Sequence, residues 1–158
     1  MPAFRTQRRV PFSPKQMFDL VADVEKYPEF LPLCEALSVE QRLTSPAGHA
    51  ILVARMVAGY GAIRESFKSQ VTLRPEDDLI EVAYIDGPFR YLSNTWTFLD
   101  VDGDCQIDFF ISYEFRSAIL GIVVGKLFDT AFLKFSEAFE ARAHVVYGSA
   151  QRSALLGN

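Results

Sequence analysis

The stretch CQIDFFISYEF, residues 105–115, has apolar side chains at every second position and mostly polar side chains between them. Its apolar positions are Cys105, Ile107, Phe109, Ile111, Tyr113 and Phe115. A period of two over this length is typical of a β-strand with one buried face and one polar face. We therefore predict a half-buried strand here, and other elements must supply the layer that covers its apolar face.

The apolar spacing changes to that of a helix after residue 117, which predicts a helix over residues 119–146. Such a helix has about seven turns at 3.6 residues per turn. Its apolar face carries Val124, Leu127, Phe128, Ala131, Phe132, Phe135, Ala138, Phe139 and Arg142. A helix of this length with a stripe of rings is suited to cover a sheet.

Upstream of the quoted strand, the period of two extends back to residue 37, interrupted by turns rich in Gly, Pro and Asp. The turns fall at residues 44–49, 74–78, 86–89 and 100–104, and GYG at residues 59–61 indicates a bend or bulge. This pattern predicts about five or six antiparallel strands. A further strand over residues 3–10 comes before a helix that Ser13 caps, with Pro14 at its first position.

These elements together predict an α+β fold. The apolar face of the sheet needs a cover, and the last helix is the largest predicted element able to provide it. We expect a curved antiparallel β-sheet wrapped around the long C-terminal helix, with a hydrophobic cavity between them. The 158 residues suit one domain, which we place at residues 1–148, and we expect residues 149–158 to form a frayed tail.

The segment VEKYPEFLPLCEAL, residues 24–37, is unusually apolar for a connection. Pro28 ends the preceding helix, because the residue before a proline is disfavoured in helical conformation. Phe30 and Leu31 lie between Pro28 and Pro32, which stiffen the chain. We interpret this segment as a lid over an apolar cavity.

The inward-facing rings have two interpretations. They either fill a solid core, as such spacing usually indicates, or they line a ligand cavity. The apolar lid and the aromatic content of 13% favour the cavity. Its predicted wall is Phe30, Leu31, Phe67, Trp96, Phe98, Phe109, Ile111, Tyr113, Phe128, Phe132 and Phe139.

Residues for catalysis or metal binding are sparse. The two histidines, His49 and His144, lie far apart in sequence and suit surface roles, so we predict neither a metal site nor an enzyme. Glu65 and Arg142 are the charged residues predicted on apolar faces. They either pair with polar neighbours, since a buried lone charge is costly, or contact a ligand head group.

The formal net charge of −4 disfavours DNA as a partner. The cluster RTQRR, which contains Arg5, Arg8 and Arg9, suits an edge strand protected by positive charge, with contact to RNA phosphates as the alternative. Cys34 and Cys105 lack metal-ligand spacing and are expected to be reduced, packed thiols. Residues 1–10 lack the apolar core of a secretory signal, which favours a cytoplasmic location.

Five blocks of the sequence resemble the coenzyme Q-binding protein family, within the START-like (polyketide cyclase-like, helix-grip) superfamily. They are VADVEKYPEFLPLCEAL, ESFKSQVTL, DGPFRYLSNTWTF, DFFISYEFRS and AFEARAHVVYG, and the similarity runs from about residue 4 to residue 148. The match is looser over ARMVAGYGAI. The resemblance implies a helix-grip fold that binds ubiquinone in a hydrophobic tunnel, as a carrier or chaperone supporting respiratory electron transport and without a catalytic cofactor.

The same family includes a bacterial ribosome association toxin, so binding to a ribosomal subunit is the alternative function. A cyclase-type enzyme with Glu65 and Tyr113 as its acid and base is a weaker third hypothesis. Mitochondrial members carry a targeting extension, and none precedes Phe4 here. The expected setting is therefore a bacterial cytoplasm, with transient contact to the surface of the inner membrane.

Overall fold

The computed structural model describes residues 3–156, which form one seven-stranded sheet, two α-helices and two short 3₁₀ helices. The elements in chain order are β1 Ala3–Val10, α1 Pro14–Ala22, η1 Val24–Glu29, β2 Cys34–Thr44, β3 Ala50–Tyr60, β4 Ile63–Arg74, η2 Pro75–Asp77, β5 Leu79–Asp86, β6 Phe89–Val101, β7 Asp104–Phe115 and α2 Ala118–Leu156. The predicted strands and both predicted helices are therefore present.

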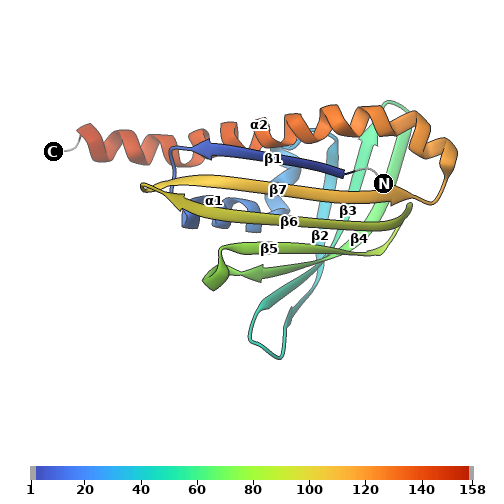
Figure 1. Cartoon of the computed structure of the whole chain (residues 1–158), viewed down its shortest axis with the longest axis horizontal. Helices are drawn as coiled ribbons and strands as arrows, with labels where there is room; N and C mark the ends of the chain where they lie inside the picture. Colours follow the sequence, from blue (N-terminus) through green and yellow to red (C-terminus); the bar gives the residue numbers. More distant parts are fainter. Residues whose placement is uncertain (1–2, 157–158) are drawn as a thin grey trace.

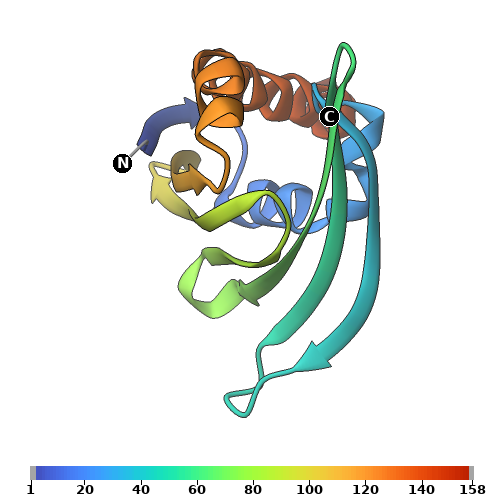
Figure 2. The same ribbon diagram turned by 90° about the vertical axis from the view of Figure 1, so that its right-hand side faces the viewer.

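The sheet is antiparallel throughout, in the order β1-β7-β6-β5-β4-β3-β2. It curls so strongly that β2, β3 and β4 stand across from β1 and β7, and α2 lies over the open side of the curl (Figure 2). Figure 1 shows α2 running alongside β1 and β7, both of which it contacts. The expected α+β helix-grip fold is confirmed.

Helix α1 begins as predicted. Ser13 Oγ accepts a hydrogen bond from the backbone N–H of Gln16 at 3.1 Å, and Gln16 Oε1 accepts one from the backbone N–H of Ser13 at 3.0 Å. This reciprocal capping box satisfies two donors that the start of a helix leaves unpaired. The helix buries Met17 and Val21 against the sheet.

The segment predicted as a lid differs from expectation. Helix α1 ends at Ala22, and Pro28 lies inside the 3₁₀ helix η1 rather than ending the first helix. The Tyr27 hydroxyl donates to the backbone oxygen of Val21, and the Leu31 N–H donates to the Tyr27 oxygen at 2.8 Å. Tyr27 and Leu31 are buried, so this segment is a packed part of the wall.

Helix α2 continues to Leu156, beyond the predicted end at residue 146. The Tyr147 hydroxyl donates to the backbone oxygen of Gln16 in α1 at 2.8 Å, which holds the helix against its neighbour at the point where Gly148 would weaken it. Residues 150–156 include Ala, Gln, Arg and Leu, which are strong helix formers. The frayed tail at 149–158 stays a prediction, and its residues 157–158 lie outside the described residues.

Among residues 3–156, no helix has the length and apolarity needed to cross a bilayer.

Candidate ligand-binding cavity

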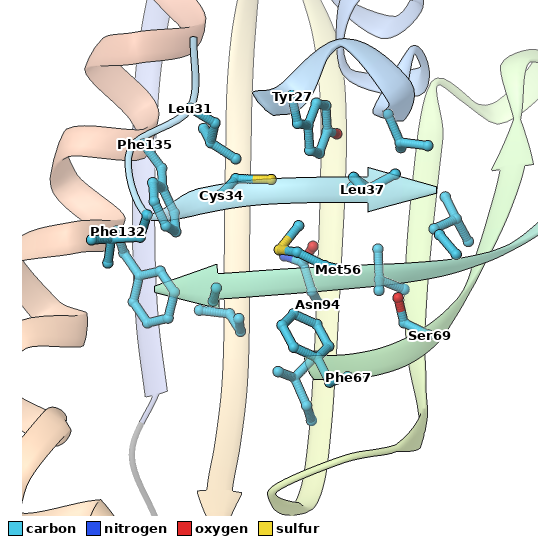
Figure 3. Close-up of a pocket in the computed structure, with 18 of the residues that line it drawn as sticks. Tyr27, Leu31, Cys34, Leu37, Met56, Phe67, Ser69, Asn94, Phe132 and Phe135 are labelled. Carbon is cyan, nitrogen blue, oxygen red and sulfur yellow. The ribbon is translucent and has the colours of Figure 1, made fainter. Parts of the chain in front are cut away.

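A cavity of about 160 Å³, here called the inner cavity, lies between the curled sheet, η1 and α2 (Figure 3). Strands β2 to β7 and α2 all contribute side chains to it. The lining residues are Val24, Tyr27, Leu31, Pro32, Leu33, Cys34, Leu37, Ala54, Met56, Ala58, Phe67, Ser69, Val71, Ile80, Val82, Phe89, Leu92, Asn94, Trp96, Phe109, Ile111, Phe128, Phe132, Phe135 and Phe139. The wall is almost entirely apolar, which suits an apolar ligand.

The structure brings most of the predicted wall residues together. Those that line the inner cavity are Leu31, Phe67, Trp96, Phe109, Ile111, Phe128, Phe132 and Phe139. Phe30, Phe98 and Tyr113 are not among the described residues that line it. Contact between these side chains and a ligand stays a prediction.

Phe98 and Tyr113 do not reach the inner cavity because other rings cover them. Phe98 is 0% exposed and meets Phe18 of α1 edge-on, with ring centroids 5.7 Å apart. Tyr113 meets Phe128 and Phe132 of α2 at centroid distances of 5.4 and 5.7 Å. Both residues face inward as predicted, and they belong to the packed core.

Phe30 and Arg142 form a contact outside the inner cavity. The Phe30 ring packs edge-on against Phe139, with centroids 5.2 Å apart. The Arg142 guanidinium lies over the Phe30 ring, 5.1 Å from its centroid. Arg142 Nη2 also donates to Glu29 Oε1 at 3.0 Å, and this bond lowers the pKa of Glu29. Arg142 therefore has a structural partner, one of its two predicted roles.

Two polar residues of the inner cavity, Ser69 and Asn94, were absent from the predicted site. Asn94 Nδ2 donates to the backbone oxygen of Phe110 at 2.8 Å, and Asn94 Oδ1 accepts from Trp96 Nε1 at 3.0 Å. Ser69 on β4 is buried, and its hydroxyl forms no hydrogen bond with a described residue. Each residue lies at an inward-facing position in the alternation of its own strand, and this sequence signal would have identified both residues.

A second cavity of about 50 Å³, the outer cavity, adjoins the first. Both are lined by Leu33, Ala58, Phe67, Phe89 and Phe128. Glu65 lines the outer cavity, whereas Tyr113 is not among the described residues that line either one. The acid and base pair of the cyclase hypothesis is therefore not assembled in a cavity.

The titratable groups of the inner cavity are held in their neutral forms. Burial raises the pKa of the Cys34 thiol to about 11, and burial also raises the pKa of Tyr27 far above its usual value. Cys34 and Cys105 are both free and buried, as expected. Neither Cys34 nor Tyr27 supplies an anion near neutral pH.

The two histidines and the arginine cluster are not among the described residues that line either cavity. His49 contacts Glu76 and is largely covered, and His144 packs edge-on against Phe12. On β1, which is an edge strand as predicted, Arg8 pairs with Glu140 at 2.6 Å and Arg9 with Asp104 at 3.1 Å. His49 is therefore less exposed than expected, and two of the three arginines are already neutralised.

Comparison with known sequences finds toxins and a coenzyme Q-binding protein among the relatives. The chain is 34% identical to the ribosome association toxin RatA of Rickettsia prowazekii over 149 residues, covering 92% of this chain and 99% of the relative. It is 32% identical to the mitochondrial coenzyme Q-binding protein COQ10 of Drosophila melanogaster over 135 residues, covering 82% of this chain and 53% of the relative. The resemblance inferred from the sequence is confirmed.

Solved structures share the fold. An 18 kDa protein from Caulobacter crescentus, known from its solution structure, matches with a TM-score of 0.77 and 30% identity, covering 94% of this chain and 99% of that one. The Zhui aromatase/cyclase from a Streptomyces strain matches with a TM-score of 0.66 and 19% identity, covering 97% and 95%. The fold thus also occurs in an aromatase/cyclase, so the fold alone does not indicate function.

The sequence family described as "Polyketide cyclase / dehydrase and lipid transport" matches residues 10–140. That range includes η1, all strands from β2 to β7 and the part of α2 that lines both cavities. The chain belongs to the polyketide cyclase / dehydrase and lipid transport family.

Proposed function

We propose that this protein binds a polyisoprenoid quinone, with ubiquinone as the first candidate, and carries it without chemical change in support of respiratory electron transport. The observation that carries the proposal is the inner cavity, a nearly apolar space with two polar groups on its wall. The relationship to a coenzyme Q-binding protein supports the choice of ligand.

The volume of the inner cavity limits how a quinone is held. An apolar cavity of about 150 Å³ accepts one six-membered ring, so a volume of about 160 Å³ matches a head group rather than a tail. The tail would leave through the outer cavity after Phe67 and Phe128, both partly exposed, change rotamer. Burial of one five-carbon isoprene unit contributes about 4 kcal/mol at roughly 0.8 kcal/mol per methylene.

Ser69 is the polar group best placed to orient the head group. Its hydroxyl lies on the cavity wall without a protein partner among the described residues, and a quinone carbonyl accepts a hydrogen bond. Asn94 already uses its amide to hold Phe110 and Trp96. We therefore assign head-group recognition to Ser69 in place of Glu65 and Arg142.

The absence of an ionised group from the wall of the inner cavity supports a carrier rather than an enzyme. Among the residues described there, Cys34 and Tyr27 are protonated at neutral pH and no carboxylate is present. General acid–base chemistry needs a group whose pKa lies near the working pH. The proposed setting is the cytoplasm of a bacterium, with transient contact to the membrane that holds the quinone.

Trp96 provides a direct test, because it is the sole tryptophan of the sequence and lines the inner cavity. A quinone bound beside the indole accepts its excited-state energy or electron and quenches its fluorescence. We expect saturable quenching by a ubiquinone with one or two isoprene units. Organic extraction of freshly purified protein should also release a quinone, identified by mass spectrometry. Linear, unsaturable quenching together with no extracted quinone would reject the proposal.

Binding to a ribosomal subunit is the second candidate, favoured by the RatA relatives. On β1 it would rest mainly on Arg5, which lies over the ring of Phe110 at 4.9 Å, because Arg8 and Arg9 already pair with acids. This function predicts co-sedimentation with a ribosomal subunit that weakens with salt. Replacing all three arginines by glutamine should abolish it, and failure of the wild type to pellet at low salt would remove this candidate.

A further inference from the structure

The first turns of α2 expose three large apolar side chains. Ile119, Ile122 and Val123 have exposed fractions of 76%, 79% and 53%. Their spacing of three and four residues places them on one face of the helix. We call these three residues the apolar tip. Apolar side chains gathered on a surface in this way mark an interaction site more often than singly scattered ones do.

The apolar tip lies at the mouth of the outer cavity. On the opposite side of the same helical turns, Leu120 and Val124 line that cavity. Gly59 and Ile63, from the β3–β4 hairpin, form the facing wall. The end of this hairpin and the first turns of α2 lie toward the same end of the molecule, away from the C-terminus (Figure 1), and Figure 2 shows them facing each other from opposite sides. A molecule leaving the outer cavity here would emerge next to exposed isoleucines.

Two arginines lie close to the start of α2: Arg116 comes two residues before it, and Arg90 follows Phe89, which Arg116 contacts. Arg90 and Arg116 are exposed, and neither forms an ion pair with a residue in the described part of the chain. Arg116 Nε donates to the backbone oxygen of Phe89 at 3.0 Å, which fixes this residue just before α2 begins. Glu65, the carboxylate on the outer cavity wall, is partly buried. Exposed cations beside apolar side chains suit a surface with anionic head groups.

We propose that the apolar tip docks on a lipid bilayer containing anionic lipid, and that docking places the mouth of the outer cavity among the lipid head groups. This inference rests on the proposed quinone-binding function. A quinone then moves between bilayer and cavity without its tail crossing water. Arg90 and Arg116 contact lipid phosphates, while Ile119, Ile122 and Val123 enter the boundary between head groups and acyl chains.

A bilayer fits this surface better than a protein partner does. Stable protein interfaces bury roughly 800 Å² on each partner, which three side chains do not supply. A protein seated on the apolar tip would also cover the mouth of the outer cavity. Membrane insertion gains free energy in proportion to the apolar area buried and needs only a small surface when lipid charge adds to it.

Vesicle flotation tests the docking surface. We expect the wild type to float with phosphatidylcholine vesicles containing 30% phosphatidylglycerol and to bind pure phosphatidylcholine vesicles at least threefold more weakly. The variant I119S/I122S should bind the anionic vesicles at least tenfold more weakly. The matched control is V145S/V146S, because Val145 and Val146 are also exposed apolar residues of α2 but lie far from the outer cavity. It should bind like the wild type.

A separate variant tests how much positive charge contributes to vesicle binding. Arg90→Gln should reduce binding to anionic vesicles by about two- to threefold and leave binding to neutral vesicles unchanged. Equal losses in I119S/I122S and V145S/V146S would overturn the proposal, since any exposed apolar residue would then serve. A wild type that does not float with either vesicle would also overturn it.

Quinone binding in solution, measured by quenching of Trp96, separates this inference from the function on which it rests. Quenching without vesicle binding leaves the proposed function standing and rejects the docking surface. Vesicle binding through the apolar tip, with neither saturable quenching nor an extracted quinone, rejects the quinone function. I119S/I122S should retain wild-type quenching by a short-chain quinone in detergent-free buffer, because neither side chain lines a cavity.

Discussion

The two ends of the protein interior are built from the same kinds of residue and differ in packing. Around α1, the residues Phe12, Met17, Phe98 and Cys105 have at most 1% exposure, and we call this region the solid end. Beneath η1 and the middle of α2, rings of similar size surround the inner cavity. We call this the hollow end. The contrast shows that inward-facing rings leave no space where α1 packs directly against them, and that they surround a cavity where α1 does not reach.

Trp96 and Phe98 show the contrast within one strand. They lie two residues apart on the same face of β6 and stack at a centroid distance of 6.4 Å. Phe18 of α1 covers Phe98, whereas Trp96 borders the inner cavity. Because α1 is short, it covers only part of the concave face of the sheet. The hollow end begins where α1 stops covering that face.

Removing a ring should reveal the largest difference between the two ends. Phe98→Ala leaves a void among tightly packed neighbours, and we expect a loss of about 3–5 kcal/mol in the free energy of unfolding. Phe67→Ala removes a partly exposed ring beside existing empty space, and we expect a loss of roughly 1–2 kcal/mol. Urea denaturation measures both. Equal losses would mean that the hollow end is as tightly packed as the solid end.

Adding the same side chain at both ends gives a smaller and more specific effect. Ala143 is 0% exposed on α2 at the solid end, and Ala54 lines the inner cavity. Ala143→Leu should overpack the core and cost about 1–3 kcal/mol. Ala54→Leu should change stability by less than about 1 kcal/mol, because its extra methyl groups enter empty space.

Quinone binding provides a second measurement that distinguishes Ala54→Leu from Ala143→Leu. Ala54→Leu should weaken quenching of Trp96 by a short-chain quinone at least tenfold, since the added side chain occupies the space of the ring. Ala143→Leu should leave quenching unchanged wherever the protein stays folded. Full quinone affinity in Ala54→Leu would show that the ligand binds elsewhere.

The fold was predictable because it follows from local periodicity. The alternation in residues 105–115 defined β7, and the Phe spacing in the last helix defined the face that covers the sheet. Ser13 and Pro14 marked the start of α1 correctly. These signals act within one element, so they do not depend on how the elements meet.

The cavity wall was only partly predictable because it depends on contacts between elements. The sequence placed Phe98 and Trp96 on the same face and contained no indication that Phe18 would cover one of them. Phe30 was predicted to face the cavity, but η1 turns its ring onto Arg142 and Phe139. Ser69 lines the inner cavity from the same strand as Phe67, two residues away, and its importance emerges only once a cavity surrounds it.

Head-group recognition at the hollow end predicts that loss of the Ser69 hydroxyl changes the free energy of quinone binding by about 1 kcal/mol. Ser69→Ala removes a hydroxyl that forms no hydrogen bond with a described residue, so stability should change by less than about 0.5 kcal/mol. Quinone affinity should fall about two- to thirteenfold, the contribution of one hydrogen bond of roughly 0.5–1.5 kcal/mol. Ser38→Ala on an exposed edge strand is the control. Unchanged affinity in Ser69→Ala would remove Ser69 from the binding site.

The smallest expected effect compares the buried thiols of the two ends. Burial raises the pKa of Cys34 to about 11 at the hollow end and that of Cys105 to about 12 at the solid end. The unfolded thiols ionise near pH 9, so the unfolded state loses protons first, and this stabilisation disappears as pH rises from 9 through the folded values. Between pH 8 and 9.5 each thiol should account for a loss on the order of half a kcal/mol. Urea denaturation of Cys34→Ala and Cys105→Ala at both pH values measures this loss of stability. Each variant should lack the part of the loss that its own thiol causes in the wild type. If Cys34→Ala keeps the full pH dependence, the thiol at the hollow end already reaches water through the cavity.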